Sequence, residues 1–171
     1  MTPATWITLS RLVGIPFLLY FLYDPTPVRQ WSSLVIFLVV ACTDFLDGYV
    51  ARRFDMVTDL GKFLDPLVDK LLILGTMLAL VEIDRIPAWG VFLVLARELT
   101  ISGWRVNQTK ISGANIWGKL KTVSQIVALS LLIAPLSEVW YLPSLIAFWI
   151  CVILTLISGA IYLFPAAAVD E

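Results

Sequence analysis

The chain has 171 residues, of which 60% are hydrophobic and 15% charged, and its mean hydropathy is +0.90. A soluble domain of this size is about 45–50% apolar, so the composition predicts an integral membrane protein. The formal net charge of −1 gives no bulk basicity of the kind that nucleic-acid binding uses. The sequence contains no histidine, which excludes histidine-based triads and histidine-ligated zinc.

Six hydrophobic segments follow one another along the chain, and we expect each to form a transmembrane helix. Their bounds are about Trp6–Tyr23, Trp31–Ala51, Lys62–Val81, Ile86–Val106, Ile116–Leu136 and Leu145–Phe164. The last segment carries no charge, and its roughly 20 residues span a ~30 Å hydrocarbon core at ~1.5 Å per residue. The first carries Arg11 inside it and lacks a cleavage site, so we expect it to be retained. The sequence therefore predicts one all-α transmembrane domain over residues 1–171.

The positive charges are distributed unevenly between the two ends of these segments. If the N-terminus is cytoplasmic, only Arg29 and Arg85 fall on the far side. The near side then receives Arg11, Arg52, Arg53, Lys62, Lys70, Arg97, Arg105, Lys110, Lys119 and Lys121. Because Lys and Arg mark cytoplasmic loops, both termini are expected to be cytoplasmic, in a membrane of the bacterial inner-membrane type.

Two acidic pairs flank the loop between the second and third segments. Asp44 and Asp47 are three residues apart, and Asp65 and Asp69 are four apart. On a helix, either spacing places both carboxylates on one face, one turn from each other. Unpaired carboxylates at membrane depth are costly, whereas carboxylates aimed at one point form a hard-oxygen site for Mg²⁺, Mn²⁺ or Ca²⁺. The sequence therefore predicts a divalent-metal site at which both pairs meet.

Small and basic residues accompany the carboxylates. Gly48 lacks a side chain next to an acidic ligand, so a nucleotide can approach the backbone closely. Arg52 can hold a phosphate or a carboxylate through its planar guanidinium. Asp65 precedes Pro66, which leaves two alternatives. Either a helix begins there with proline in its first turn, or the helix is kinked at the proline.

The spacing D-x2-D-G-x2-A-R-x8-G-x3-D-x3-D, from Asp44 to Asp69, resembles the signature of the CDP-alcohol phosphotransferases at every fixed position. The resemblance extends over nearly the whole chain and implies a bundle of six transmembrane helices, a homodimer and two Mg²⁺ or Mn²⁺ ions. It implies that Asp44, Asp47, Asp65 and Asp69 bind the ions and that Asp69 is also the catalytic base. The contacts to nucleotide and pyrophosphate that it implies are Thr5, Thr8, Gly48, Ala51, Arg52 and Thr58.

Cations in the second half of the chain are candidates for binding an anionic co-substrate. Arg97 and Glu98 interrupt an apolar segment, so each requires a polar partner. Phosphate is bound by arginine forks and lysine point charges. We therefore expect Arg97, Arg105, Lys119 and Lys121 to bind the phosphate of an acceptor alcohol. The alternative is that these side chains extend to the membrane interface.

Within the family, R-E-x4-G-x-R from Arg97, G-K-x-K-T from Gly118 and the opening W-I-T-L-S-R resemble the phosphatidylglycerophosphate synthases. Thr5 stands where that branch usually has asparagine. The resemblance implies transfer of a phosphatidyl group from CDP-diacylglycerol to sn-glycerol 3-phosphate, giving phosphatidylglycerol phosphate and CMP. In this reaction Asp69 accepts the proton of the 1-hydroxyl, which attacks in line.

Other functions remain open from the sequence. Within the family, the acceptor can instead be phosphatidylglycerol, as in the cardiolipin synthases, or serine or inositol phosphate. Intramembrane carboxylates also occur in cation transporters, and aspartates bind pyrophosphate through Mg²⁺ in intramembrane prenyltransferases. Neither of these classes accounts for Gly48, Ala51 and Arg52 at their fixed spacing.

Overall fold

The computed structural model describes residues 3–53, 59–106 and 116–163, with the side chains of residues 10–43, 64, 66–104 and 116–163. Within these ranges every regular element is helical. The helices are α1 (Pro3–Tyr23), α2 (Pro27–Arg53), α3 (Asp59–Glu82), α4 (Ala88–Val106), α5 (Ile116–Ile133), the short 3-10 helix η1 (Glu138–Trp140) and α6 (Tyr141–Leu163). The all-α prediction is confirmed for this part of the chain, and each predicted segment corresponds to one α-helix.

Proline accounts for two differences between the predicted and the observed helix bounds. The second helix begins at Pro27, four residues before the expected start. Proline suits the first position of a helix because its missing N–H would have no partner there. The fifth helix ends at Ile133 rather than Leu136, because Pro135 disfavours helical geometry in the residue before it. After η1, the last helix begins at Tyr141.

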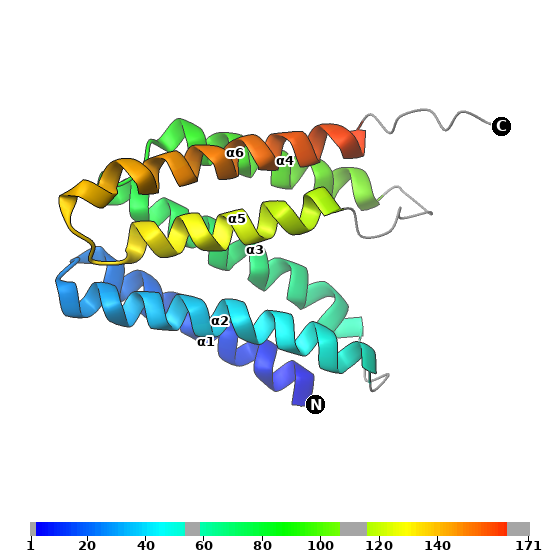
Figure 1. Cartoon of the computed structure of the whole chain (residues 1–171). Coiled ribbons are helices and arrows are strands. Elements are labelled where there is room, and N and C mark those ends of the chain that lie inside the picture. The colour runs from blue at the N-terminus through cyan, green and yellow to red at the C-terminus, as the bar shows by residue number, and fades with distance from the viewer. Residues whose placement is uncertain (1–2, 54–58, 107–115, 164–171) are drawn as a thin grey trace.

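The six α-helices lie side by side and run alternately in opposite directions (Figure 1). One group is formed by α1 with α2 and α3, and another by α6 with α4 and α5. The groups meet where α2 packs against α5 and where α3 packs against α4 and α5. The starts of α1, α3 and α5 therefore share one end of the bundle with the last turns of α2, α4 and α6. We call this the site end.

The interior of the bundle is apolar and receives side chains from nearly every helix. Leu18 from α1, Phe37 from α2, Met77 from α3, Leu129 from α5 and Phe148 from α6 are each fully buried. Burial of such a side chain stabilises the fold by about 1.5–3 kcal/mol. This core fixes the helices against one another and so determines which side chains meet at the site end.

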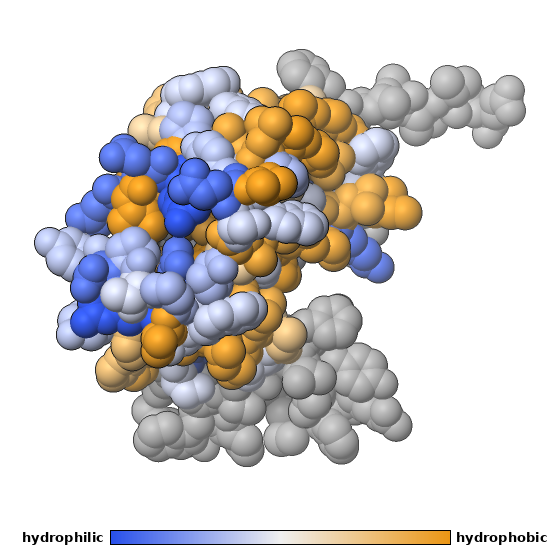
Figure 2. Space-filling model, turned by 60° about the vertical axis from the view of Figure 1, so that its left-hand side comes forward, coloured by the Kyte–Doolittle hydropathy of each residue, from blue (hydrophilic) through white to orange (hydrophobic). Residues whose placement is uncertain are grey.

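The sides of the bundle are also apolar, although they are exposed. Phe17, Leu78, Phe92, Val127 and Ile150 come from five different helices, and each is at least 50% exposed. The end opposite the site end is formed by the connections α1–α2, α3–α4 and α5–α6. Figure 2 brings this end forward and shows hydrophilic residues gathered there, with hydrophobic residues along the adjoining sides. Apolar sides between polar ends are the pattern of a protein surrounded by lipid.

Two helical stretches in the described ranges are long and apolar enough to cross a membrane by themselves. They are Ile116–Ile133, with a mean hydropathy of 1.3, and Glu138–Leu163, with a mean hydropathy of 2.4. Two shorter apolar stretches, Ser10–Tyr23 of α1 and Pro27–Thr43 of α2, also lie within the described residues. The expected number of six membrane spans stays a prediction.

Candidate active site at one end of the bundle

Both acidic pairs lie on helices at the site end. Asp44 and Asp47 are in the last turns of α2, and Asp65 and Asp69 are in the first half of α3, which packs against α2. The side chain of Asp69 is half-buried, whereas the side chains of the other three aspartates lie outside the described residues. Carboxylate pairs one turn apart on two adjacent helices fit a hard divalent cation. The four-aspartate ligand set itself stays a prediction.

The structure excludes one of the two alternatives for Pro66, the start of a helix at this position. Helix α3 begins at Asp59 and continues through Pro66 to Glu82, so the proline lies inside the helix rather than in its first turn. Proline has no N–H to donate to the preceding turn. Asp65 and Asp69 therefore flank this interruption on one continuous helix.

The residues expected to contact the nucleotide also belong to this end, as far as the structure describes them. Gly48, Ala51 and Arg52 are in the last turns of α2, and Thr5 and Thr8 are in the first turns of α1. Their backbones are helical, but their side-chain positions, like Thr58 as a whole, lie outside the described residues. Their roles remain predictions.

A cavity of about 420 Å³ opens between α3, α4, α5 and α6 at the site end. Its charged lining consists of Asp69, Lys70, Arg97, Glu98 and Lys121. The remaining lining residues are Pro66, Ile101, Ser102, Gly118, Thr122 and Tyr162. The volume lies in the range of small-molecule sites. The cavity therefore brings one residue of the acidic motif together with two of the cations expected to bind the acceptor.

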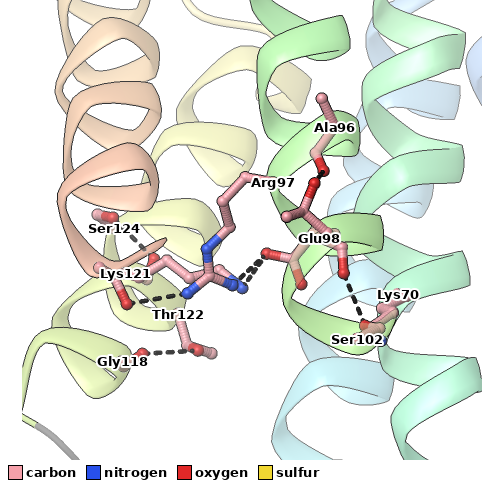
Figure 3. Close-up of polar contacts among 11 residues, drawn as sticks. Lys70, Ala96, Arg97, Glu98, Ser102, Gly118, Lys121, Thr122 and Ser124 are labelled. Carbon is pink, nitrogen blue, oxygen red and sulfur yellow. Dashed lines mark hydrogen bonds and ion pairs between the residues drawn. The ribbon is translucent and has the colours of Figure 1, made fainter. Parts of the chain in front are cut away.

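Glu98 holds these two cations together. Its Oε1 accepts a hydrogen bond from Arg97 Nη1 at 3.0 Å and another from Lys121 Nζ on α5 (Figure 3). Both contacts are also ion pairs. The side chain of Arg97 is 9% exposed, that of Glu98 10% and that of Lys121 13%. Water therefore screens their charges weakly. The expectation that Arg97 and Glu98 require polar partners is confirmed. Both cations turn into the bundle rather than out toward an interface.

Further hydrogen bonds extend this cluster to the neighbouring helices. Arg97 Nη2 donates to Ser158 Oγ of α6 at 3.0 Å. On the other side, Lys70 Nζ of α3 donates to Ser102 Oγ, and that hydroxyl donates to the backbone oxygen of Glu98 at 2.6 Å. The cluster thus joins α3, α4, α5 and α6, and it sets the orientation of the cations before any ligand binds.

The structure does not show a contact of this cavity with the other two predicted acceptor residues, Lys119 and Arg105. Lys119 is exposed and does not belong to the lining of this cavity, and the side chain of Arg105 near the end of α4 is not among those described. Sequence reasoning missed the contributions of Lys70 and Ser158. Lys70 was detectable because it follows Asp69 directly. Ser158 gave no signal, because it belongs to a helix whose sequence is otherwise apolar.

The charges of the cavity suit an anion that must approach a carboxylate. Lys70, Arg97 and Lys121 contribute three positive charges, and Asp69 and Glu98 contribute two negative ones. Glu98 is already engaged with two of the cations. The excess of positive charge can bind a phosphate, and the carboxylate of Asp69, a group capable of accepting a proton, lies in the same cavity.

Comparison with known proteins agrees with this chemistry. The chain is 35% identical to a CDP-diacylglycerol--glycerol-3-phosphate 3-phosphatidyltransferase of Bacillus subtilis, over 90% of this chain and 89% of the relative. It is 37% identical to a protein of the same name from Shigella flexneri, over 96% of this chain and 94% of the relative. A probable phosphatidylglycerophosphate synthase of Mycobacterium tuberculosis is 35% identical, over 93% of this chain and 78% of the relative.

The sequence model of the family described as CDP-alcohol phosphatidyltransferase matches residues 1–157. Members of this family are membrane-embedded enzymes that generally depend on a divalent metal. With a match over nearly the whole chain and relatives of similar length, the protein belongs to the CDP-alcohol phosphatidyltransferase family.

Proposed function

We propose that this protein transfers the phosphatidyl group of CDP-diacylglycerol to sn-glycerol 3-phosphate, forming phosphatidylglycerol phosphate and CMP. The observation that carries the proposal is the shared cavity, in which Asp69 lies with Lys70, Arg97 and Lys121. The names of the relatives support this acceptor. Membership of a phosphatidyltransferase family argues against a cation transporter and against a prenyltransferase.

The donor is assigned to the part of the site end formed by α1, α2 and α3. In the proposal, Asp44, Asp47, Asp65 and Asp69 hold two Mg²⁺ or Mn²⁺ ions. When bound, these ions offset the negative charge of the pyrophosphate and of the departing CMP. The contacts to cytidine and pyrophosphate are assigned to Thr5, Thr8, Gly48, Ala51, Arg52 and Thr58.

The acceptor is assigned to the cavity between α3, α4, α5 and α6. Arg97 and Lys121 bind the phosphate of glycerol 3-phosphate, and Lys70 adds a third positive charge. Arg105 and Lys119 belong to the same end of the bundle and attract the anion toward the cavity. Binding at two cations held by Glu98 orients the alcohol so that its 1-hydroxyl faces Asp69.

Asp69 acts as the general base of the reaction. It accepts the proton of the 1-hydroxyl while that oxygen forms a bond to the phosphorus atom bearing diacylglycerol. The bond from this phosphorus to the oxygen of CMP breaks on the opposite side, and CMP leaves with the electron pair. A carboxylate is a much weaker base than the alkoxide of the attacking alcohol. The proton is therefore transferred as the new bond forms, rather than before it.

The proposal extends to the surroundings of the enzyme. The chain forms a single catalytic domain with six membrane spans, which works as a homodimer in the bacterial inner membrane, with the site end and both termini in the cytoplasm. This placement leaves the acyl chains in hydrocarbon while the nucleotide and glycerol phosphate reach the site from water. The positive charges at the site end support this orientation.

The function is tested with purified protein, CDP-diacylglycerol, Mg²⁺ and one candidate alcohol at a time. We expect CMP release and phosphatidylglycerol phosphate with glycerol 3-phosphate, and no comparable product with phosphatidylglycerol, serine or inositol phosphate. Mass spectrometry identifies the lipid. If only one of the other alcohols reacts, the proposed acceptor is wrong, whereas the family assignment stands.

The role of Asp69 is tested by Asp69→Asn, which keeps the size of the side chain and removes the base. We expect turnover to fall at least about 100-fold, as for other general bases, with little change in the thermal unfolding temperature. Asp84→Asn, in the α3–α4 connection, is the matched control and should keep full activity. Full activity of Asp69→Asn would remove this residue from the base role.

A further inference from the structure

The orientation of Arg97 depends on two residues of α6 to which no role has been assigned. Arg97 lies on α4, and its side chain crosses to α6, where Ser158 Oγ accepts a hydrogen bond from Nη2 at 3.0 Å. Ser158 is fully buried and Gly159 is buried beside it. Residues 97 and 158 are 61 positions apart, so only the packing of α4 against α6 brings them together.

Gly159 provides the space that the arginine side chain occupies. A Cβ atom on this residue would lie 2.8 Å from Arg97 Cγ, 3.2 Å from Nε and 3.5 Å from Cδ. The first distance is shorter than real Cβ contacts show, and it involves the root of the side chain rather than its flexible tip. Any larger residue at position 159 therefore has to displace the whole guanidinium group.

The position of Arg97 is also costly for the protein. Its Nε is buried and has no hydrogen-bond partner among the described residues. Buried polar groups are nearly always paired, because a buried donor without a hydrogen bond lowers stability. An arginine that only connected two helices could use this donor for a further hydrogen bond. In this geometry the guanidinium points toward Glu98, although one of its donors remains without a hydrogen bond to the described part of the chain.

From these contacts we infer that the Ser158–Gly159 step of α6 is a positioning element, which holds the Arg97 guanidinium against Glu98 and so determines the affinity for a phosphorylated acceptor. The inference rests on the proposed function, because it takes Arg97 as the residue that binds the acceptor phosphate. Neither residue of the step is expected to touch the substrate. Both act through Arg97, and the step gives the apolar helix α6 a part in the choice of acceptor.

The inference is tested with Gly159→Ala in steady-state kinetics. We expect the KM for glycerol 3-phosphate to rise about tenfold or more, because a misplacement of about 1 Å can cost up to 100-fold. The KM for CDP-diacylglycerol should stay within about twofold. Gly75→Ala is the matched control, since its Cβ would meet only ordinary contacts at 3.9 Å from Ile15 and Leu19. The Gly75→Ala variant should have the same KM values for glycerol 3-phosphate and CDP-diacylglycerol as the parent protein.

A double-mutant cycle separates positioning from a general loss of structure. Arg97→Ala removes the side chain that a methyl group at position 159 would displace. Adding Gly159→Ala to this variant should therefore change the KM for glycerol 3-phosphate no further. Ser158→Ala removes only the hydrogen-bond acceptor, and we expect a smaller rise of about fivefold. Because this change removes a single atom, it carries the test if Gly159→Ala does not fold.

The possible results distinguish the inference from the proposed function. If Arg97→Ala leaves the KM for glycerol 3-phosphate unchanged, the acceptor role of Arg97 is wrong, and the inference is wrong with it. If Arg97→Ala raises this KM but Gly159→Ala and Ser158→Ala do not, only the inference is overturned. It is also overturned if Gly159→Ala raises both KM values equally, or if its effect persists without the Arg97 side chain.

Discussion

The ion pairs formed by Glu98 and by Asp24 show how burial changes the contribution of a carboxylate to stability. Glu98 accepts from Arg97 and Lys121, and all three side chains are at most 13% exposed. Asp24 pairs with Arg29 at 2.6 Å, but this aspartate is 64% exposed. Exposed pairs contribute about 0–1 kcal/mol, whereas removing one partner of a buried pair leaves a charge without compensation. The same kind of contact therefore has different consequences at the two ends of the bundle.

At the residue scale we predict that Glu98→Ala lowers the free energy of unfolding by about 3 kcal/mol, because it leaves two buried cations facing each other. Asp24→Ala should lower it by less than about 1 kcal/mol. Thermal or denaturant unfolding in detergent measures both. Equal effects of the two substitutions would contradict the view that Glu98 compensates Arg97 and Lys121.

At the element scale, the approach of α4 to α6 determines where Arg97 and Glu98 lie. A Cβ on Gly90 would come within 2.7 and 2.8 Å of two ring atoms of Phe148, which is fully buried. The missing side chain lets α4 pack directly on the aromatic ring. Because Arg97 follows Gly90 by about two turns, this contact also fixes the height at which Arg97 meets Ser158.

We predict that Gly90→Ala destabilises the protein by about 1–3 kcal/mol, because the aromatic ring or the whole helix has to move. This loss occurs although alanine favours a helix over glycine by about 1 kcal/mol. Gly75→Ala makes the same chemical change where there is room, and it should be neutral or stabilising. A higher unfolding temperature for Gly90→Ala than for the parent protein would show that the α4–α6 contact tolerates a side chain.

At the scale of the whole molecule, alternating helices collect the chemistry at one end of the bundle. The acidic pairs come from α2 and α3, and the cations from α3, α4 and α5. The sides between the two ends expose apolar residues. A reaction that joins a lipid-anchored donor to a water-soluble acceptor requires this arrangement, because both substrates meet at the membrane surface.

The proposed orientation predicts which positions a membrane-impermeant thiol reagent reaches. In a Cys42→Ser background, Glu138→Cys should react from the outer face of intact cells. Ile116→Cys, at the site end, should react only in inverted vesicles. Both native side chains are exposed, and Cys151 is buried and can be retained. The reverse pattern would place the site end outside and contradict the proposed orientation.

The sequence by itself determined the properties that are local along the chain. Apolar runs of helical length predict the six helices, and the spacings of Asp44 with Asp47 and of Asp65 with Asp69 place each pair on one helix face. The family followed from the same motif and was confirmed by comparison. These features depend on residues that are close together in the sequence, so they can be deduced without knowing how the helices pack.

Only the tertiary structure decided which side chains share the cavity. It placed Lys70 beside Ser102, joined Glu98 to Lys121 across two helices, and set Arg97 against Ser158 and Gly159. It also resolved the place of Pro66 inside a continuous helix. The physical reason is that these contacts join segments far apart in sequence, and their distances depend on how closely the helices pack. A serine and a glycine within an apolar helix do not indicate, from the sequence alone, that they contact an arginine of another helix.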